Sequence, residues 1–146
     1  MFAGTAIFTI ITTHIMNAPL SAVNDLIHTI DTLRGPGGCP WDGKQSLISL
    51  KRYLLEETQE LAEALESGDR QNICEELGDV LYLVMMLSRI GEEEQSFDFE
   101  LVCCRINEKL IRRHPHVFET PQPLDDDALK KQWESIKKQE KAMQNR

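Results

Sequence analysis

The run VLYLVMML at residues 80–87 constrains the fold more than any other stretch of the sequence. It lies in the middle of a helix that we expect to extend from about Arg70 to Ile90. A helix that is apolar on every side must be surrounded by protein. In a chain of 146 residues, we expect part of that protein to come from another subunit.

Four further stretches are expected to be helices because of the spacing of their apolar residues and the signals at their ends. The first covers residues 20–33 and ends at the run GPGG. The second begins at Gln45 or Ser46 and ends at the turn Ser67-Gly68-Asp69, and its apolar stripe consists of Leu47, Leu50, Leu54, Leu61 and Leu65. The third and fourth cover residues 97–113 and 126–143. The stretch CPWDGKQ is expected to be a loop. No sustained alternation of β-branched residues indicates a strand, so we predict an all-α helical bundle that is completed by oligomerisation.

The first fifteen residues, MFAGTAIFTIITTHI, differ in character from the rest of the chain. A secretory signal needs a basic segment before its apolar one, and a membrane span needs about 20 apolar residues. Neither condition is met, so no membrane association is expected. We predict that residues 1–15 are an extension, either disordered or an artefact of the start site, and that residues 16–146 form a single domain.

Charge and cysteine usage narrow the function classes. The formal net charge is −8, which argues against a nucleic-acid-binding surface because such a surface needs a basic stripe. The four cysteines form no C-x-x-C pair, so neither a disulfide framework nor a zinc site is indicated. We expect free, buried thiols in a reducing compartment, and therefore a cytoplasmic protein.

Two short acidic motifs fall on the apolar sides of neighbouring expected helices. Residues three or four apart share a helix face, and Glu57 and Glu60 in LLEETQE lie along the leucine stripe of their helix. Glu76 and Asp79 in EELGD lie in the same way on the next helix. Because one tight turn joins the two helices, the four carboxylates are expected to face one another.

Carboxylates held this close need a counter-charge. At ~4 Å and an effective dielectric constant of about 20, one contact between like charges costs roughly 4 kcal/mol. Oxygen ligands of this kind suit a hard divalent cation, Mg²⁺ or its substitute Mn²⁺. The alternative is that each acidic pair belongs to an ordinary solvated helix face. A di-iron bundle is disfavoured because no glutamate is followed three residues later by a histidine.

Basic residues recur at helical spacing toward the end of the helix expected at residues 97–113: Arg105, Lys109 and Arg112, with Arg113 adjacent. In an acidic protein with a bound cation, such a stripe is suited to holding a polyphosphate. The alternative is pairing on the surface, for instance between Glu108 and Arg112. The sequence has no G-x-x-x-x-G-K loop, so phosphate binding would depend on the metal and on side chains.

The two tryptophans differ in their surroundings. An indole is more often part of a core than a ligand contact, because it buries a large apolar area. Trp133, however, lies in the otherwise polar segment DDDALKKQWESIKKQEKA. We therefore expect Trp133, rather than Trp41, to stack on a base.

Taken together, these motifs resemble the MazG family of nucleoside triphosphate pyrophosphohydrolases. The shared landmarks are GGCPWD at residues 37–42, LLEE-x-x-E at 54–60, EELGD at 75–79, NEKLIRRHPHVF at 107–118 and W-E-x-x-K-x-x-E-K at 133–141. The resemblance covers residues 20–141. It implies an all-α fold that assembles as a homodimer or higher homo-oligomer, and a Mg²⁺-dependent cleavage of a nucleoside triphosphate to the monophosphate and pyrophosphate.

The resemblance also implies roles for individual residues. The metal ligands would be Glu57, Glu60, Glu76 and Asp79, and the substrate-binding residues would be Lys109, Arg112, Arg113, Trp133 and Lys137. For the catalytic step we expect Glu57 and its neighbour Glu56, which would orient a water that attacks the α-phosphorus. The stretch GKQSL after CPWD departs from the family pattern, and this leaves base selectivity open. Two alternatives remain: a related pyrophosphohydrolase for a phosphoribosylated or other non-NTP nucleotide, and a non-catalytic helical oligomer.

Overall fold

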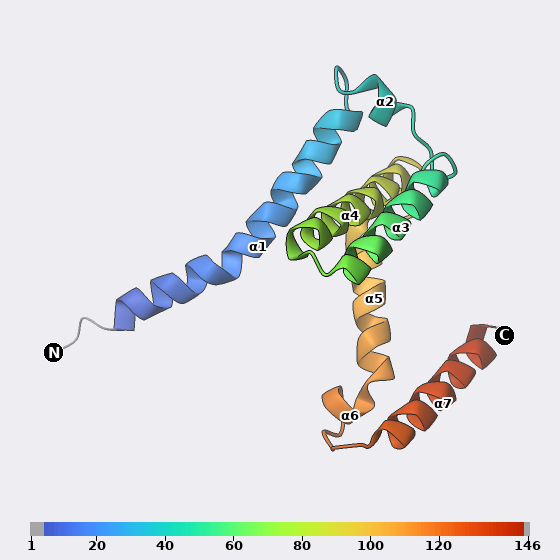
Figure 1. Ribbon diagram of the computed structural model, residues 1–146. Coiled ribbons are helices and arrows are strands. Elements are labelled where there is room, and N and C mark those ends of the chain that lie inside the picture. The colour runs from blue at the N-terminus through green and yellow to red at the C-terminus, as the bar shows by residue number, and fades with distance from the viewer. Residues whose placement is uncertain (1–4, 145–146) are drawn as a thin grey trace. The chain divides into compact units, whose positions relative to one another are not determined.

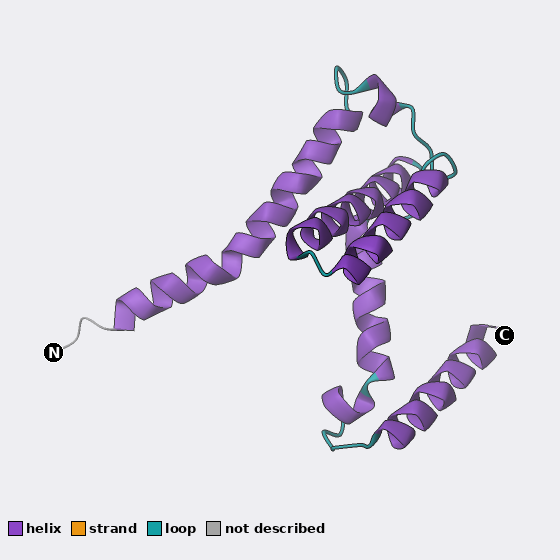
Figure 2. Cartoon of the chain, in the orientation of Figure 1, coloured by secondary structure: helices purple, strands orange, loops and turns teal. Residues whose placement is uncertain are grey.

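The computed structural model describes the backbone of residues 5–144 and the side chains of residues 20–143. Throughout that part of the chain the regular elements are helices joined by loops, with no strand (Figure 2). The helices are α1 (Thr5–Arg34), α2 (Pro40–Gly43), α3 (Lys51–Ser67), α4 (Arg70–Glu93), α5 (Phe99–Arg113), α6 (Pro115–Phe118) and α7 (Asp126–Gln144). The prediction of an all-α fold is confirmed.

Internal contacts divide the chain into two compact units, residues 1–99 and residues 100–146. The first unit contains α1 to α4, and the second contains most of α5 together with α6 and α7. The expected separation of residues 1–15 from a domain at 16–146 stays a prediction: residues 1–4 lie outside the described residues, and α1 begins at Thr5. Among the described helices, none is both long and apolar enough to cross a membrane.

An antiparallel pair, α3 and α4, forms the centre of the first unit (Figure 1). The two helices are joined by the short turn expected from the sequence. Gly68 ends α3 with a φ of 72°, a left-handed conformation that a residue without Cβ adopts readily. The Asp69 side chain then caps α4 by accepting hydrogen bonds from the backbone N–H groups of Gln71 and Asn72. The turn therefore fixes the register of the two acidic motifs.

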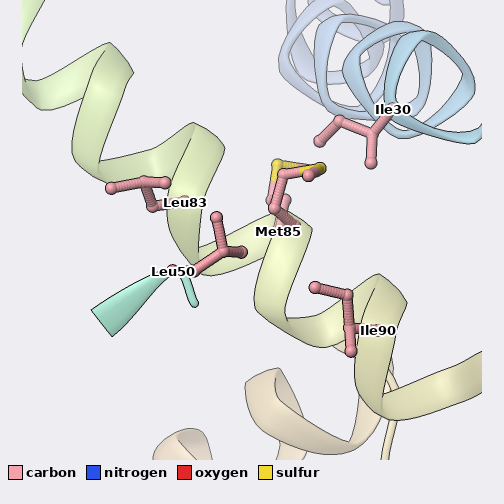
Figure 3. Packing of buried hydrophobic residues seen from close by; sticks show 6 residues of the cluster. Ile30, Leu50, Leu83, Met85 and Ile90 are labelled. Atoms are coloured by element: carbon pink, nitrogen blue, oxygen red, sulfur yellow. The ribbon is translucent and has the colours of Figure 1, made fainter. Parts of the chain in front are cut away.

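The apolar run of α4 supplies most of the core of the first unit. Figure 3 shows Ile30 on α1 and Leu50 before α3 directed toward the α4 side chains. The buried apolar cluster consists of Ile30, Leu50, Leu83, Met85, Met86 and Ile90. Not every side of α4 is covered, because Leu81 is 41% exposed. The run is thus buried on the sides facing α1 and α3 and open on another.

The helix expected from Gln45 or Ser46 begins later, at Lys51. Before that residue, Ser46 and Ser49 form a reciprocal pair, in which the hydroxyl of each accepts a hydrogen bond from the backbone N–H of the other. Reciprocal bonds of this kind have the pattern of a helix N-terminal capping box, and the Leu50 N–H donates to the Ser46 carbonyl at 3.2 Å, so the chain already turns at Ser46 before α3 begins. Leu65, which was expected on the apolar stripe, is 59% exposed. That part of the prediction is wrong, because the buried position in this turn of α3 is Ala64.

Two other boundaries differ by a short distance. The stretch CPWDGKQ contains the four-residue helix α2, which Pro40 starts at a position where proline's missing N–H is not needed. The helix expected from residue 97 begins at Phe99. The Phe97 ring instead packs so closely on Gly91 that a Cβ there would lie 2.7 Å from it.

The prediction of buried thiols is wrong, although the cysteines are free as expected. Cys74, Cys103 and Cys104 are exposed, and Cys39 is partly buried. Cys103 and Cys104 lie on α5, a helix with no buried residue. A thiol is readily accommodated in a core, but these three thiols lie at the surface of the described structure.

A buried carboxylate connects the segment before α3 to α4. Asp42 is 6% exposed and accepts a hydrogen bond of 2.5 Å from the Tyr82 hydroxyl. The Arg34 guanidinium donates to the Asp42 carbonyl oxygen at 2.5 Å and pairs with Glu93 at 2.6 Å. These contacts hold the end of α1 and the short helix α2 against α4.

Candidate functional site

Three carboxylates on α3 and α4 come together in the first unit. Glu57, Glu76 and Asp79 each offer an oxygen atom, and these atoms all lie within 4.8 Å of one another. Glu57 and Glu76 are partly buried, whereas Asp79 is exposed. The structure therefore gathers three of the four acidic residues that the sequence selected as metal ligands.

The fourth residue, Glu60, is exposed and lies outside this triplet. Its negative charge nevertheless affects the pKa values of residues within the triplet. Partial burial, followed by the charges of Glu60, Asp79 and Glu76, raises the pKa of the Glu57 carboxyl. Partial burial and then Glu60 and Asp79 likewise raise the pKa of Glu76. A raised pKa means that the negative forms of Glu57 and Glu76 are disfavoured as the side chains stand.

An open depression of about 830 Å³ adjoins the acidic cluster. Its lining residues come from α3 and the start of α4: Leu55, Glu56, Gln59, Glu60, Glu63, Ala64, Ser67, Asn72 and Glu76. Glu56, expected to orient a water, is exposed and lines this space. The depression gives a small polar molecule access to the cluster.

The donor set fits a divalent cation. All three converging groups are carboxylates, the ligand type that Mg²⁺ and Mn²⁺ prefer. Partial burial raises the pKa of Glu57 and Glu76, and the charges of the neighbouring carboxylates raise the pKa further. A bound cation relieves such an accumulation of charge. Within the described side chains, these three carboxylates make no ion pair with a lysine or arginine. A cation is therefore a chemically suitable partner.

The basic residues expected to bind phosphate lie in the second unit. Arg112 and Arg113, at the end of α5, both pair with Glu140 on α7, at N–O distances of 2.7 Å. The alternative pairing of Arg112 with Glu108 is not the one that the structure shows. Lys109 and Lys137, the other two basic candidates, are exposed.

Trp133 is surrounded by groups of the same unit. Its ring makes an edge contact with His114 at 5.6 Å between ring centres, and the Arg113 guanidinium lies 5.3 Å from its centre. The residue is 36% exposed. The Trp133 ring therefore lies beside the Arg113 guanidinium. This arrangement is suitable for a residue that stacks on a base next to a phosphate-binding group.

Sequence reasoning missed two contacts that organise these regions. The sequence analysis placed Asp42 only within the motif GGCPWD. Its contact with Tyr82 could have been suspected from the tyrosine, because a tyrosine within an apolar run usually finds a hydrogen-bond partner for its hydroxyl. Glu140 was not singled out, although it forms ion pairs with both arginines at the end of α5. Its distance from them in the sequence concealed that contact.

The comparison with known protein families identifies the chain's relatives. Residues 45–118, which include the acidic motifs and the basic end of α5, match the family described as the MazG nucleotide pyrophosphohydrolase domain. The chain belongs to the MazG family. The resemblance inferred from the sequence motifs is thereby confirmed.

Two relatives each match more than three quarters of the chain. The chain is 49% identical over 112 residues, 77% of its length, to the uncharacterized protein YabN of Bacillus subtilis. It is 48% identical over 118 residues, 80% of its length, to the nucleoside triphosphate pyrophosphohydrolase/pyrophosphatase MazG of Thermotoga maritima. The matched parts are 23% and 44% of those proteins, so the chain spans less than half the length of either relative.

A solved structure extends the likeness to three dimensions. The crystal structure of a mazG-related protein from Thermotoga maritima matches with a TM-score of 0.67 and 30% sequence identity. The match covers 79% of this chain and 98% of that protein. The helical fold is therefore shared with a MazG-related protein, over nearly the whole length of that protein.

Proposed function

We propose that the protein is a Mg²⁺-dependent pyrophosphohydrolase that cleaves nucleoside triphosphates to the monophosphate and pyrophosphate. The observation that carries this proposal is the convergence of Glu57, Glu76 and Asp79 in a chain of the MazG family. A relative with 48% identity is named a nucleoside triphosphate pyrophosphohydrolase/pyrophosphatase. A water would attack the α-phosphorus, the bond from that phosphorus to the bridging oxygen would break, and pyrophosphate would leave.

The acidic residues of the first unit divide into two roles. Glu57, Glu76 and Asp79, with Glu60 nearby, would hold the cation, and when bound it would neutralise the triphosphate and the charge that develops on it. Mn²⁺ would serve as a substitute. Glu56 lies next to the cluster in the sequence and lines the adjoining depression, so it would accept a hydrogen bond from the attacking water.

The basic residues of the second unit would contact the triphosphate. Arg112 and Arg113 supply planar donors suited to phosphate oxygens, and Lys109 and Lys137 supply compact charges. Trp133 would stack on the base, since its ring is 36% exposed and lies beside Arg113. Together these residues would bind the substrate without a glycine-rich loop.

We also propose that the protein works as a homo-oligomer. Three large apolar side chains close in sequence to the acidic residues are exposed: Leu55 at 61%, Leu77 at 53% and Leu81 at 41%. A second copy of the chain would remove these side chains from water and would enclose the open depression that Leu55 lines. Size-exclusion chromatography with light scattering tests this, and a monomer at micromolar concentration would contradict it.

A panel of nucleoside triphosphates incubated with the protein and Mg²⁺ tests the main proposal. We expect release of pyrophosphate and not of orthophosphate. Glu57→Gln and Asp79→Asn should each lower the rate by at least about 100-fold, with an unchanged far-UV circular dichroism spectrum. The matched control is Glu66→Gln, an exposed residue at the end of α3, which should retain activity. Full activity in both cluster variants would reject the site.

Two other functions would give different results in the same assay. A pyrophosphohydrolase for a phosphoribosylated or other non-NTP nucleotide would release pyrophosphate from that substrate and from none of the triphosphates. A non-catalytic helical oligomer would release pyrophosphate from nothing in the panel, and Mg²⁺ would leave its melting temperature unchanged.

A further inference from the structure

Glu140 on α7 pairs with both arginines at the end of α5. Its Oε1 accepts from Arg112, from Nε at 2.9 Å and from Nη2 at 2.7 Å. Its Oε2 accepts from Arg113, from Nε at 3.2 Å and from Nη2 at 2.7 Å. One carboxylate therefore holds two adjacent guanidinium groups, one on each oxygen.

The same side of each guanidinium is used in both contacts. An arginine has five N–H donors in a rigid plane. Glu140 occupies the Nε and Nη2 side of Arg112 and of Arg113. The Nη1 group and the second N–H of Nη2 lie outside these contacts, and this end of the guanidinium can still form a paired contact with phosphate oxygens.

Burial separates Glu140 from the other charged residues of its helix. Its side chain is 16% exposed, although most residues of α7 are exposed. The Arg113 side chain is 20% exposed, and that of Arg112 is 53% exposed. A shielded carboxylate between two guanidinium groups restricts their rotamers more than a solvated surface pair would.

We propose that Glu140 is a positioning residue for substrate binding: it holds Arg112 and Arg113 side by side with their outer N–H groups directed to the triphosphate. This inference rests on the proposed function, in which those arginines contact phosphate. Without Glu140, two like charges on neighbouring residues would separate into solvent, and binding the triphosphate would have to order both side chains again.

Simple charge counting makes the opposite prediction. The two arginines and Glu140 carry a net charge of +1, and removal of the carboxylate raises it to +2. If local charge alone governed binding, Glu140 would compete with phosphate for the arginines, and its neutralisation would tighten binding. The sign of the change in KM therefore separates positioning from competition.

The test is steady-state kinetics of pyrophosphate release by the full-length protein with Mg²⁺. Glu140→Gln should raise KM about tenfold, the factor that corresponds to one lost charge-assisted contact, with kcat within about twofold. Glu140→Asp, which keeps the charge but shortens the side chain, should also raise KM. The control Glu134→Gln removes the same charge from an exposed position of α7 and should leave KM unchanged.

A double-mutant cycle shows whether Glu140 acts through the arginines. In an Arg112→Gln, Arg113→Gln background, Glu140→Gln should change KM by less than about twofold, because nothing remains to be positioned. A merely structural role would lower the melting temperature without this coupling. An unchanged or lowered KM in Glu140→Gln, or a full tenfold effect in the background without the arginines, would overturn the inference.

The inference stays testable if the proposed reaction is wrong. In that case wild-type protein releases no pyrophosphate, and binding of inorganic tripolyphosphate replaces the kinetic assay. Trp133 fluorescence reports it in a Trp41→Phe background, because Arg113 lies beside the Trp133 ring. Glu140→Gln should weaken tripolyphosphate binding about tenfold. Equal or tighter binding would reject the positioning role independently of catalysis.

Discussion

The contact between Asp42 and Tyr82 gives a sharp prediction about stability. Tyr82→Phe removes one hydroxyl and leaves a 6% exposed carboxylate without its 2.5 Å donor. A hydrogen bond to a charged group contributes about 1.5–3 kcal/mol. We expect Tyr82→Phe to lower the free energy of unfolding by about 2 kcal/mol, and at roughly 2–4 °C per kcal/mol the melting temperature by about 4–8 °C.

Urea unfolding followed by far-UV circular dichroism measures the effect. The other tyrosine of the chain provides the control, because the Tyr53 hydroxyl contacts Arg52 at the surface. Tyr53→Phe should change the free energy of unfolding by less than about 0.5 kcal/mol. The reasoning is refuted if Tyr82→Phe costs no more than Tyr53→Phe.

The same contact predicts a dependence on alkaline pH. Burial, and then the hydrogen bond to Asp42, raises the pKa of Tyr82. The folded protein therefore keeps the phenol proton at a pH where the unfolded chain loses it. This contribution to stability is fully present below pH about 10, the pKa of an unperturbed tyrosine, and is lost as the pH rises toward the folded value. In Tyr82→Phe, that alkaline loss should be smaller.

Three further predictions concern the cation, a close contact and the arginine pair. Mg²⁺ should raise the melting temperature of the wild type, and the rise should disappear in Asp79→Asn, since that residue supplies one of the three converging oxygens; differential scanning fluorimetry measures both. Gly91→Ala should cost about 1–3 kcal/mol in urea unfolding, because the new methyl would lie 2.7 Å from the Phe97 ring; a neutral result would contradict this packing. The arginines lower the pKa of Glu140 from 4.5 to about 2, so its contribution to stability is present above pH about 4.5 and is lost as the pH falls toward 2; acid unfolding of Glu140→Gln should lack this component.

Local patterns were sufficient to predict α4, most of α3 and the acidic cluster that the two helices carry. The three-and-four spacing that places Glu57 and Glu76 on the apolar faces of their helices depends only on helical geometry. The turn at Gly68 brings those faces together. Three of the four expected ligands therefore converge, and the sequence contained all the information needed for that result.

Contacts between distant segments were not predictable in this way. Asp42 meets Tyr82 forty residues later, and Glu140 meets Arg112 twenty-eight residues earlier. No periodicity encodes such pairs, because each depends on how the intervening chain returns. The predicted start of α3 at Gln45 or Ser46 falls instead on the reciprocal hydrogen bonds of Ser46 and Ser49, in the turn that leads into the helix at Lys51.

The short turn between α3 and α4 has a consequence for insertions and deletions. An α-helix advances by about 100° per residue. One residue added between Asp69 and Glu76 would rotate Glu76 and Asp79 together around the axis of α4, away from Glu57, while preserving every amino acid of both motifs. The number of residues in this stretch therefore matters as much as their identities for the acidic cluster, and a length variant that kept its composition would be expected to lose the convergence of Glu57, Glu76 and Asp79.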